Sequence, residues 1–303
     1  VFSHEKYRVL PNCKKRSAIL SVSCYRRIII MTEGQVKEHV DNAGENCMHS
    51  AVSSIKPAKN ILRPVGKAIS DYQMISDGDR LLLGLSGGKD SLTLLHVLRH
   101  LQSYAPVKFE LSVATVDPCI DGFDPSPLKG YLADLGIDYY YSKQEVARQA
   151  AENMQGDSFC AYCSRMRRGI LYSTARKHNC NKLVLAQHLD DLAESFMMSV
   201  FHGGSLRTMK ASYTIDAGDL QVIRPLVYVR ERQLEKFARQ AGLPVIADNC
   251  PACFSKPTQR QHMKLLLAQE EKTTSHLFAN MLHAMRPLMG QVQVKESRQK
   301  VKD

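Results

Sequence analysis

The order of apolar segments along residues 81–201 is the feature that most limits the fold of this chain. Short apolar runs of strand length alternate with segments that have helical spacing. The expected strands are 81–85, 111–116, 137–141 and 183–186, and the expected helices between and after them are 92–101, 127–135, 166–177 and 189–201. Strands that alternate with helices of about ten residues or more indicate a parallel sheet covered on both faces. We therefore expect an α/β fold with a doubly wound parallel sheet.

Helical patterns also precede and follow this alternation. One begins at Lys59, and three more are expected at 231–240, 256–268 and 275–285. The expected organisation has four parts: a basic leader at 1–57, an α/β domain at 58–225, a small helical C-terminal extension at 226–290, and a polar, disordered tail at 291–303.

Charge separates the leader from the rest of the chain. The whole chain has 41 Lys+Arg against 30 Asp+Glu, and residues 1–30 carry seven basic residues against the single acid Glu5. An acid-poor N-terminus of this kind is typical of transit peptides, so a mitochondrial or plastid location stands beside the cytoplasmic one. An untranslated leader, with Met31 as the initiator, is a further reading. No apolar run approaches the roughly 20 residues of a membrane-spanning helix, so we expect no membrane partner.

A short polar loop follows the first expected strand. Its sequence, Ser86-Gly87-Gly88-Lys89-Asp90-Ser91, opens the next expected helix. Paired glycines let successive backbone N–H groups point into one concavity, and a helix N-terminus favours anions. The spacing matches neither the Walker A motif nor the dinucleotide fingerprint. The loop therefore predicts phosphate binding, against the alternative of a plain strand-to-helix turn.

An acidic pair follows the fourth expected strand, in His188-Leu189-Asp190-Asp191. A carboxylate at the carboxyl end of a strand is well placed to hold Mg²⁺ against phosphate oxygens. We expect Asp191 to take this role, with Asp190 as the second choice. The alternative is an acidic cluster that only stabilises the helix N-terminus.

Nine cysteines include two C-x-x-C pairs, Cys160/Cys163 and Cys250/Cys253. Four thiols in two pairs suit a structural zinc site, an iron–sulfur cluster or a redox dithiol, and their spacing does not decide among these.

The residues around these motifs carry a family resemblance. The loop at 86–91 resembles the pyrophosphate loop of the ATP pyrophosphatases, or adenine nucleotide alpha hydrolases. Three further segments resemble, in the same order, the tRNA 2-thiocytidine synthetase family. They are 160–172, which begins at Cys160, then 222–226 with Arg230-Glu231, and finally 259–261. The match runs from Val65 to about Pro287. One departure is Gln187, where family members usually have the first of two histidines.

The resemblance implies roles for individual residues. Ser86, Gly87, Gly88, Lys89, Asp90 and Ser91 would bind ATP together with Asp117, His188 and the Mg²⁺ ligand Asp191. Cys160, Cys163 and Cys250 would ligate a 4Fe-4S cluster with one iron left open for sulfur, and residues 226–290 would complete that site. Asp90 and these three cysteines are the expected catalytic residues. Cys253 is not counted a ligand in the family; a fourth-ligand or persulfide role for it is the alternative.

The activity implied is ATP-dependent 2-thiolation of cytidine at position 32 of the tRNA anticodon loop. The C2 oxygen would be adenylated, and cluster-bound sulfide would displace AMP. The resemblance also implies a cysteine desulfurase as sulfur donor, and a homodimer. The alternatives are a 2-thiouridine or lysidine synthetase with the same loop, and a zinc-stabilised, non-catalytic tRNA-binding protein.

Two basic segments next to the cysteines predict the RNA-binding surface. No acid occurs between Ser158 and Leu189. Acid-free basic helices beside one site are suited to following a phosphate backbone. The expected RNA-binding residues are Arg165, Arg167, Arg168, Lys256, Arg260 and Lys264.

Overall fold

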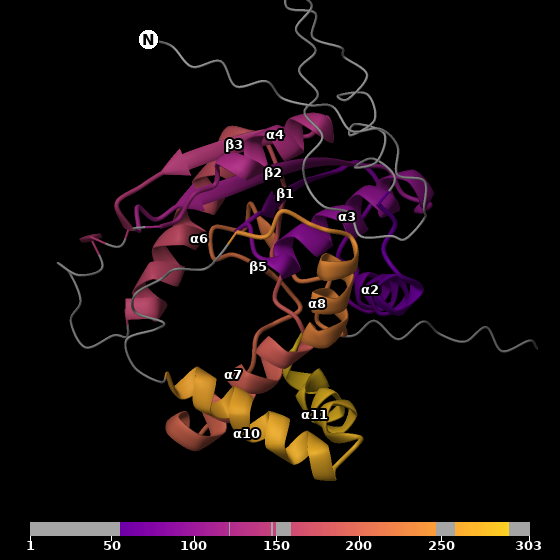
Figure 1. Cartoon of the computed structure of the whole chain (residues 1–303), viewed down its shortest axis with the longest axis vertical. Helices are drawn as coiled ribbons and strands as arrows, with labels where there is room; N and C mark the ends of the chain where they lie inside the picture. The colour runs from indigo at the N-terminus through magenta and orange to yellow at the C-terminus, as the bar shows by residue number, and fades with distance from the viewer. Residues whose placement is uncertain (1–54, 121, 147, 150–158, 247–257, 291–303) are drawn as a thin grey trace, which may run out of the picture. The chain divides into compact units, whose positions relative to one another are not determined.

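Six strands form one sheet in the order β3-β2-β1-β4-β6-β5, as the computed structural model shows (Figure 1). The parallel strands are β1 (Asp79–Gly84), β2 (Phe109–Asp117), β3 (Asp138–Lys143), β4 (Lys182–Val184) and β6 (Gln221–Ile223), and the antiparallel edge strand is β5 (Ser212–Thr214). The structure describes residues 55–120, 122–146, 148–149, 159–246 and 258–290, all within one compact unit that spans Met48–Asp303. Residues 1–54 of the predicted leader and the predicted tail, 291–303, lie outside these residues.

Helices follow most of the strands. They are α2 (Lys59–Asp71), α3 (Lys89–Tyr104), α4 (Ser126–Asp134), α6 (Phe159–Lys177), α7 (Leu189–Gly203), α8 (Glu231–Gln240), α10 (Gln259–Thr273) and α11 (Leu277–Met285), and the 3-10 turn η1 (Arg286–Leu288) ends the described chain. None of the described helices is long and apolar enough to cross a membrane.

Both faces of the sheet are covered by helices. Successive side chains of a strand point to opposite faces. Leu81 and Leu83 belong to the core that also contains the buried residues of α2, α3, α4 and α8, whereas Leu82 belongs to a second core with Leu171 and Ala175 of α6. The doubly wound α/β fold expected from the sequence is therefore confirmed.

Helix α3 holds the predicted phosphate loop against the sheet. It begins at Lys89, directly after the loop, and all eight residues from Ser91 to Leu98 are buried, including Leu92, Leu95 and Leu98 with no exposed surface. Each such burial contributes about 1.5–3 kcal/mol relative to exposure. The loop is thus fixed at both ends, by β1 before it and by α3 after it.

Helix α7 has two different environments. Leu189, Leu192 and Ala193 in its first turns are buried, whereas Phe201 near its end is 55% exposed. Helices α10 and α11 lie beside α7 (Figure 1). Its apolar composition therefore reflects contacts with the sheet at one end and with helices of the C-terminal part along its length.

The structure differs from the sequence expectations in several places. Strands β5 and β6 were not predicted, because three residues each are too short to give a periodic pattern. Helix α6 begins at Phe159 rather than Met166, and α10 covers Gln259–Thr273 rather than 256–268. The earlier start of α6 places the backbone of Cys160 and Cys163 in its first two turns.

Candidate active site

The phosphate loop has the local geometry of an anion site. Gly87 has a φ of +83°, which favours glycine, and Gly88 precedes α3 as its N-cap residue. The hydroxyls of Ser86 and Ser91 lie 3.2 Å apart, and Ser86 Oγ accepts a hydrogen bond from the Gly88 N–H at 3.3 Å. The first backbone N–H groups of a helix have no partner within the helix. The loop can therefore present these donors to a phosphate group.

Gly87 also contacts Ile246, a residue that follows α8. Its carbonyl accepts a hydrogen bond from the Ile246 N–H at 2.9 Å. A β-carbon on Gly87 would lie 2.7 Å from Cδ1 of Ile246, which is too close for real atoms. Glycine is required here both for its positive φ and for this close approach.

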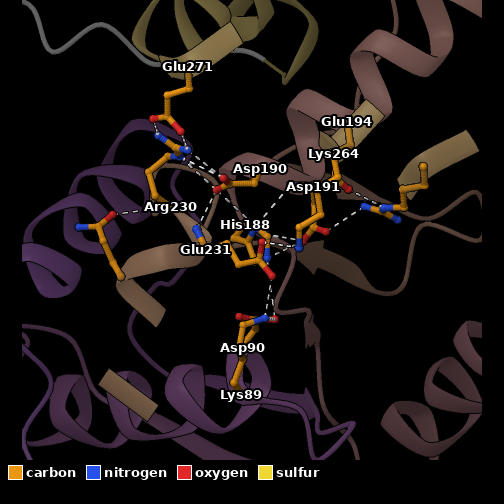
Figure 2. A network of polar contacts seen from close by, with 12 residues as sticks. Lys89, Asp90, His188, Asp190, Asp191, Glu194, Arg230, Glu231, Lys264 and Glu271 are labelled. Atoms are coloured by element: carbon orange, nitrogen blue, oxygen red, sulfur yellow. Dashed lines mark hydrogen bonds and ion pairs between the residues drawn. The ribbon is translucent and has the colours of Figure 1, made fainter. Parts of the chain in front are cut away.

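Lys89 lies between two acids. Its Nζ is 3.2 Å from Asp90 Oδ2 and 2.9 Å from Glu231 Oε1 (Figure 2). Burial works to lower the pKa of Lys89, but the charges of Asp90 and Glu231 outweigh it and raise the pKa. The lysine is therefore charged when phosphate arrives.

Asp90 has one oxygen without a hydrogen-bond partner among the described residues. Its Oδ1 is buried and makes no hydrogen bond to the described residues, whereas Oδ2 faces Lys89 and lies 3.8 Å from His188 Nε2. Burial raises the pKa of Asp90, although His188 and Lys89 act to lower it. A buried carboxylate oxygen without a donor suits a bound cation or a proton.

His188 and Asp191 cap the start of α7. The His188 N–H donates to Asp191 Oδ2 at 2.9 Å, and the Asp191 N–H donates to His188 Nδ1 at 3.3 Å, which together form a capping box. The second Asp191 oxygen, Oδ1, accepts from Arg260 Nη2 at 2.8 Å. The expected Mg²⁺ ligand is thus held rigidly, with one oxygen facing an arginine that a metal ion could replace.

Asp190 has a different arrangement. It accepts hydrogen bonds from Arg230 Nε at 3.1 and 3.2 Å and from the Glu231 backbone N–H at 2.7 Å. Arg230 in turn pairs with Glu271 at 2.6 Å and lies over the ring of Phe278 at 3.3 Å. Asp190 therefore fastens the start of α8 to the start of α7, whereas the charge of Asp191 acts to raise the pKa of Asp90 in the phosphate loop.

Two basic residues of α10, Arg260 and Lys264, also pair with these acids, and Figure 2 labels Lys264. Arg260 Nε donates to Glu194 Oε2 at 2.8 Å, and Lys264 Nζ lies 2.6 Å from Glu231 Oε2. Burial works to raise the pKa of Glu231, but hydrogen bonds from Lys264 and Lys89 outweigh it and lower the pKa to about 2. Arg260 and Lys264, expected to bind RNA, are thus placed on acids beside the phosphate loop.

Asp117 ends β2 on the same sheet edge. Its Oδ1 accepts from the Cys119 N–H at 2.8 Å, and its Oδ2 accepts from the Tyr141 hydroxyl. That hydrogen bond is the main cause that raises the pKa of Tyr141 to about 12. Because the carboxyl ends of parallel strands share one edge, Asp117 lies along the edge that carries the phosphate loop.

The expected cluster ligands are only partly within the described residues. Cys163 is buried on α6, and Cys160 lies three residues earlier in the same helix. Residues three apart on a helix share a face, so this pair suits a common metal or cluster. The Cys160 side chain and all of Cys250, Cys253 and Lys256 lie outside the described residues. Within those residues, no group of three His, Cys, Asp or Glu side chains is arranged to hold a metal ion.

The basic run on α6 is less free of acids than its sequence indicates. Arg176 forms two hydrogen bonds with Asp219, at 2.6 and 3.1 Å, and Lys182 forms a buried ion pair with Asp79 at 2.7 Å. Arg165 is exposed, and Arg167 and Arg168 are half-buried. The structure therefore corrects the inference that this whole run lacks acidic partners.

Two parts of the site were not predicted from the sequence. Glu231 appears only within a family motif and Glu194 carries no sequence signal, because Lys89 lies 142 positions from Glu231 and Arg260 lies 66 positions from Glu194. Gln187 accepts from Arg224 Nε at 2.8 Å, and Arg224 is buried. The residue that departs from the family pattern is therefore the hydrogen-bond partner of a buried arginine.

Comparison with known proteins identifies the family of this chain. A PP-loop domain family model matches residues 57–263. The chain is 40% identical over 228 residues to a tRNA-cytidine(32) 2-sulfurtransferase of Geobacter sulfurreducens, a match that covers 75% of this chain and 89% of the relative. It is 39% identical over 232 residues to the Vibrio cholerae protein of the same name, with 76% and 74% coverage.

A solved structure shows the same fold. The U34-tRNA thiolase NcsA from Methanococcus maripaludis, solved with its [4Fe-4S] cluster, matches with a TM-score of 0.63 and 21% identity, over 78% of this chain and 85% of NcsA. The resemblance indicated by the sequence motifs is confirmed, and the chain belongs to the PP-loop family and, within it, to the tRNA-cytidine(32) 2-sulfurtransferase family of transferases.

Proposed function

We propose that this chain catalyses ATP-dependent 2-thiolation of cytidine 32 in tRNA. The observation that carries the proposal is the extended similarity to tRNA-cytidine(32) 2-sulfurtransferases, which includes both the phosphate loop and the cysteine-bearing helix. Two chemical steps are required: activation of the C2 oxygen and its replacement by sulfur.

The first step is adenylation of the base. The cytosine C2 oxygen attacks the α-phosphorus of ATP, a P–O bond forms, and the bond to pyrophosphate breaks. Ser86–Ser91 and Lys89 hold the departing pyrophosphate, whose negative charge matches the charged lysine and the helix N-terminus. Asp191 and the unpartnered oxygen of Asp90 would hold Mg²⁺ against the phosphates. Asp117 and His188 would border the nucleotide.

The second step is displacement of AMP. Sulfur as hydrosulfide adds at C2, the C2–O bond to AMP breaks, and a proton is released as the thiocarbonyl forms. Cys160, Cys163 and Cys250 would hold a 4Fe-4S cluster, which supplies a binding position for that sulfur. Cys163 is buried on α6, so a sulfur held there would be kept away from bulk water. A cysteine desulfurase is the proposed sulfur source; a thiol reductant would supply the two electrons that convert its persulfide sulfur to hydrosulfide, and this thiol would become a disulfide.

The proposed tRNA-binding surface begins on α6. Arg165, Arg167 and Arg168 follow the two cysteines of that helix and would contact the phosphate backbone near the reacting base. Lys256, Arg260 and Lys264 would extend this surface, although Arg260 and Lys264 also pair with acids of the site. We further propose a cytoplasmic homodimer, with an organellar location if the leader is a transit peptide.

The test is analysis of tRNA nucleosides by mass spectrometry in cells that lack the protein. We expect loss of 2-thiocytidine alone, and its recovery with the wild-type chain but not with Cys163→Ser. Cys119→Ser is the matched control, because the contact of Cys119 with Asp117 is made by its backbone N–H and is kept by serine, so this variant should restore the nucleoside. Loss of 2-thiouridine instead would redirect the proposal to another base, and an unchanged nucleoside profile would reject it.

A further inference from the structure

Glu231 is shared between two lysines from distant parts of the chain. Its Oε1 lies 2.9 Å from Lys89 of the phosphate loop, and its Oε2 lies 2.6 Å from Lys264 of α10 (Figure 2). The side chain of Glu231 is 21% exposed, so these interactions are only partly screened by water. A single carboxylate thus forms ion pairs with two lysines.

Lys89 cannot serve both Glu231 and a phosphate with the same donor. An ammonium group has three N–H donors; two of them face Asp90 and Glu231, and the third is available to a phosphate. Phosphate carries more negative charge than a carboxylate, so it competes with Glu231 for the charge of this lysine. As Lys89 moves toward phosphate, its ion pair with Glu231 weakens and Lys264 becomes the main partner of Glu231.

We propose that Glu231 is a positioning residue that couples occupancy of the phosphate loop to the docking of α10. Binding of a pyrophosphate group withdraws Lys89 from Glu231 and strengthens the Glu231–Lys264 ion pair. By thermodynamic reciprocity, the contact from Lys264 must also favour pyrophosphate binding, because it releases Lys89 from Glu231. The inference rests on the proposed function only in taking ATP as the natural source of that pyrophosphate group.

The position of α10 gives this coupling its chemical meaning. Arg260, one turn before Lys264, pairs with Asp191 and Glu194 at 2.8 Å. A phosphate-dependent change in how firmly α10 is held would therefore also act on Asp191, the proposed Mg²⁺ ligand, through Arg260.

The test is a double-mutant cycle on the full chain with inorganic pyrophosphate as the probe. Binding is measured by calorimetry for wild type, Glu231→Gln, Lys264→Met and the double variant. We expect Lys264→Met to weaken binding roughly fivefold in the wild-type background, a typical size for coupling between sites. We expect no further weakening by Lys264→Met when residue 231 is neutral. Equal weakening in both backgrounds would mean that Lys264 attracts phosphate directly, and it would overturn the proposal.

Two control variants make the same charge changes outside the network. Glu235→Gln lies one turn further along α8, and Lys272→Met lies in the last turn of α10. Both should leave pyrophosphate affinity unchanged. A loss of affinity in either control equal to that of Lys264→Met would show that net charge alone accounts for the effect, and the coupling would be rejected.

Hydrogen exchange gives a second measurement that needs no variant of Glu231 to fold. Pyrophosphate should slow the exchange of α10 amides in the wild type and have less effect in Lys264→Met. Unchanged exchange of α10 in saturated wild-type protein would overturn the inference. Neither experiment uses tRNA or sulfur, so loss of the proposed thiolation activity would reject the proposed function without affecting this result.

Discussion

Ile246 donates its backbone N–H to the Gly87 carbonyl at 2.9 Å, and its side chain fills the space that a β-carbon on Gly87 would need. The contact therefore joins the phosphate loop to the chain that follows α8.

Gly87→Ala should damage both stability and phosphate binding. Alanine disfavours the positive φ that the fold imposes at this position, and its methyl group would lie too close to Ile246. We expect a loss of about 1–2 kcal/mol from the backbone conformation alone. The free energy of unfolding from urea titration and the pyrophosphate affinity from calorimetry would both measure the effect.

Gly130→Ala is the matched control for this substitution. Gly130 lies inside α4, and a β-carbon there would meet no atom within 4 Å. Alanine should stabilise the helix by up to about 1 kcal/mol and leave pyrophosphate affinity unchanged. If Gly87→Ala were as stable as the wild type, the proposed requirement for glycine would be wrong.

The two aspartates of the second motif should separate stability from activity. Asp190→Asn removes the charge that pairs with Arg230, whose side chain is only 14% exposed. Breaking a largely buried pair costs about 3 kcal/mol. Asp191→Asn weakens a pair with the more exposed Arg260 and should cost less than about 1 kcal/mol.

We expect the larger loss of activity in Asp191→Asn, although the larger loss of stability is expected in Asp190→Asn. Asp191→Asn should remain folded and lose ATP-dependent adenylation, because the proposed Mg²⁺ ligand is changed. Asp190→Asn should retain activity in the fraction that stays folded at low temperature. Thermal unfolding and pyrophosphate release measured on the same samples test both statements, and equal destabilisation by the two variants would contradict them.

Glu231 should make stability depend on pH in the acid range. Its pKa in the folded chain is about 2, below the ordinary value of 4.5. A depressed carboxyl pKa stabilises the folded state above the unfolded pKa, and this contribution is lost as pH falls from 4.5 toward 2. The stability difference between wild type and Glu231→Gln should be constant from pH 8 to 5 and shrink below 4.5. Urea unfolding across this range measures it, and a difference that grows with acidity would contradict the assignment.

Gln187→Ala should destabilise the chain through Arg224. The substitution leaves Nε of a buried guanidinium without the acceptor that it has at 2.8 Å. An unsatisfied buried donor costs about 1–3 kcal/mol. Gln187→Glu keeps an acceptor at the same place and should be tolerated, since its charge also compensates the arginine. Equal unfolding midpoints for the alanine variant and the wild type would show that the bond contributes nothing.

The cysteine variants should separate the cluster from the nucleotide site. After anaerobic purification we expect about four iron atoms per chain and a broad visible absorption. Cys160→Ser, Cys163→Ser and Cys250→Ser should each lose iron and thiolation while they keep pyrophosphate binding. A colourless wild-type protein with stoichiometric zinc would reject the cluster.

The α/β core could be predicted because its signals are local. The apolar run at 81–85 and the helical spacing of Leu94, Leu95 and Leu98 follow from near neighbours in the sequence, and α8 matches its expected bounds of Glu231–Gln240. Strands β5 and β6 were missed because three residues carry no period. Their existence depends on hydrogen bonds to each other and to β4.

The sequence predicts the motifs of the site but not the ion pairs that join distant residues. The loop Ser86–Ser91 and the acidic pair are contiguous, so their residue types indicate their chemistry. The pairing of Arg176 with Asp219, and of Lys264 with Glu231, depends on how distant segments pack. Four-residue spacing correctly placed Arg260 and Lys264 on one face of α10, but it could not show that this face meets acids of α7 and α8.

The contact of Asp190 with Arg230 and the Glu231 N–H has a consequence for genetics. A substitution that weakens this joint would behave in a living cell as a temperature-sensitive allele: functional during growth in the cold and defective during growth in the heat. A substitution at Asp191 would be defective at every growth temperature. Two adjacent aspartates of one motif would thus produce different phenotypes. A growth series at several temperatures would distinguish the aspartate that stabilises the fold from the one that takes part in the reaction.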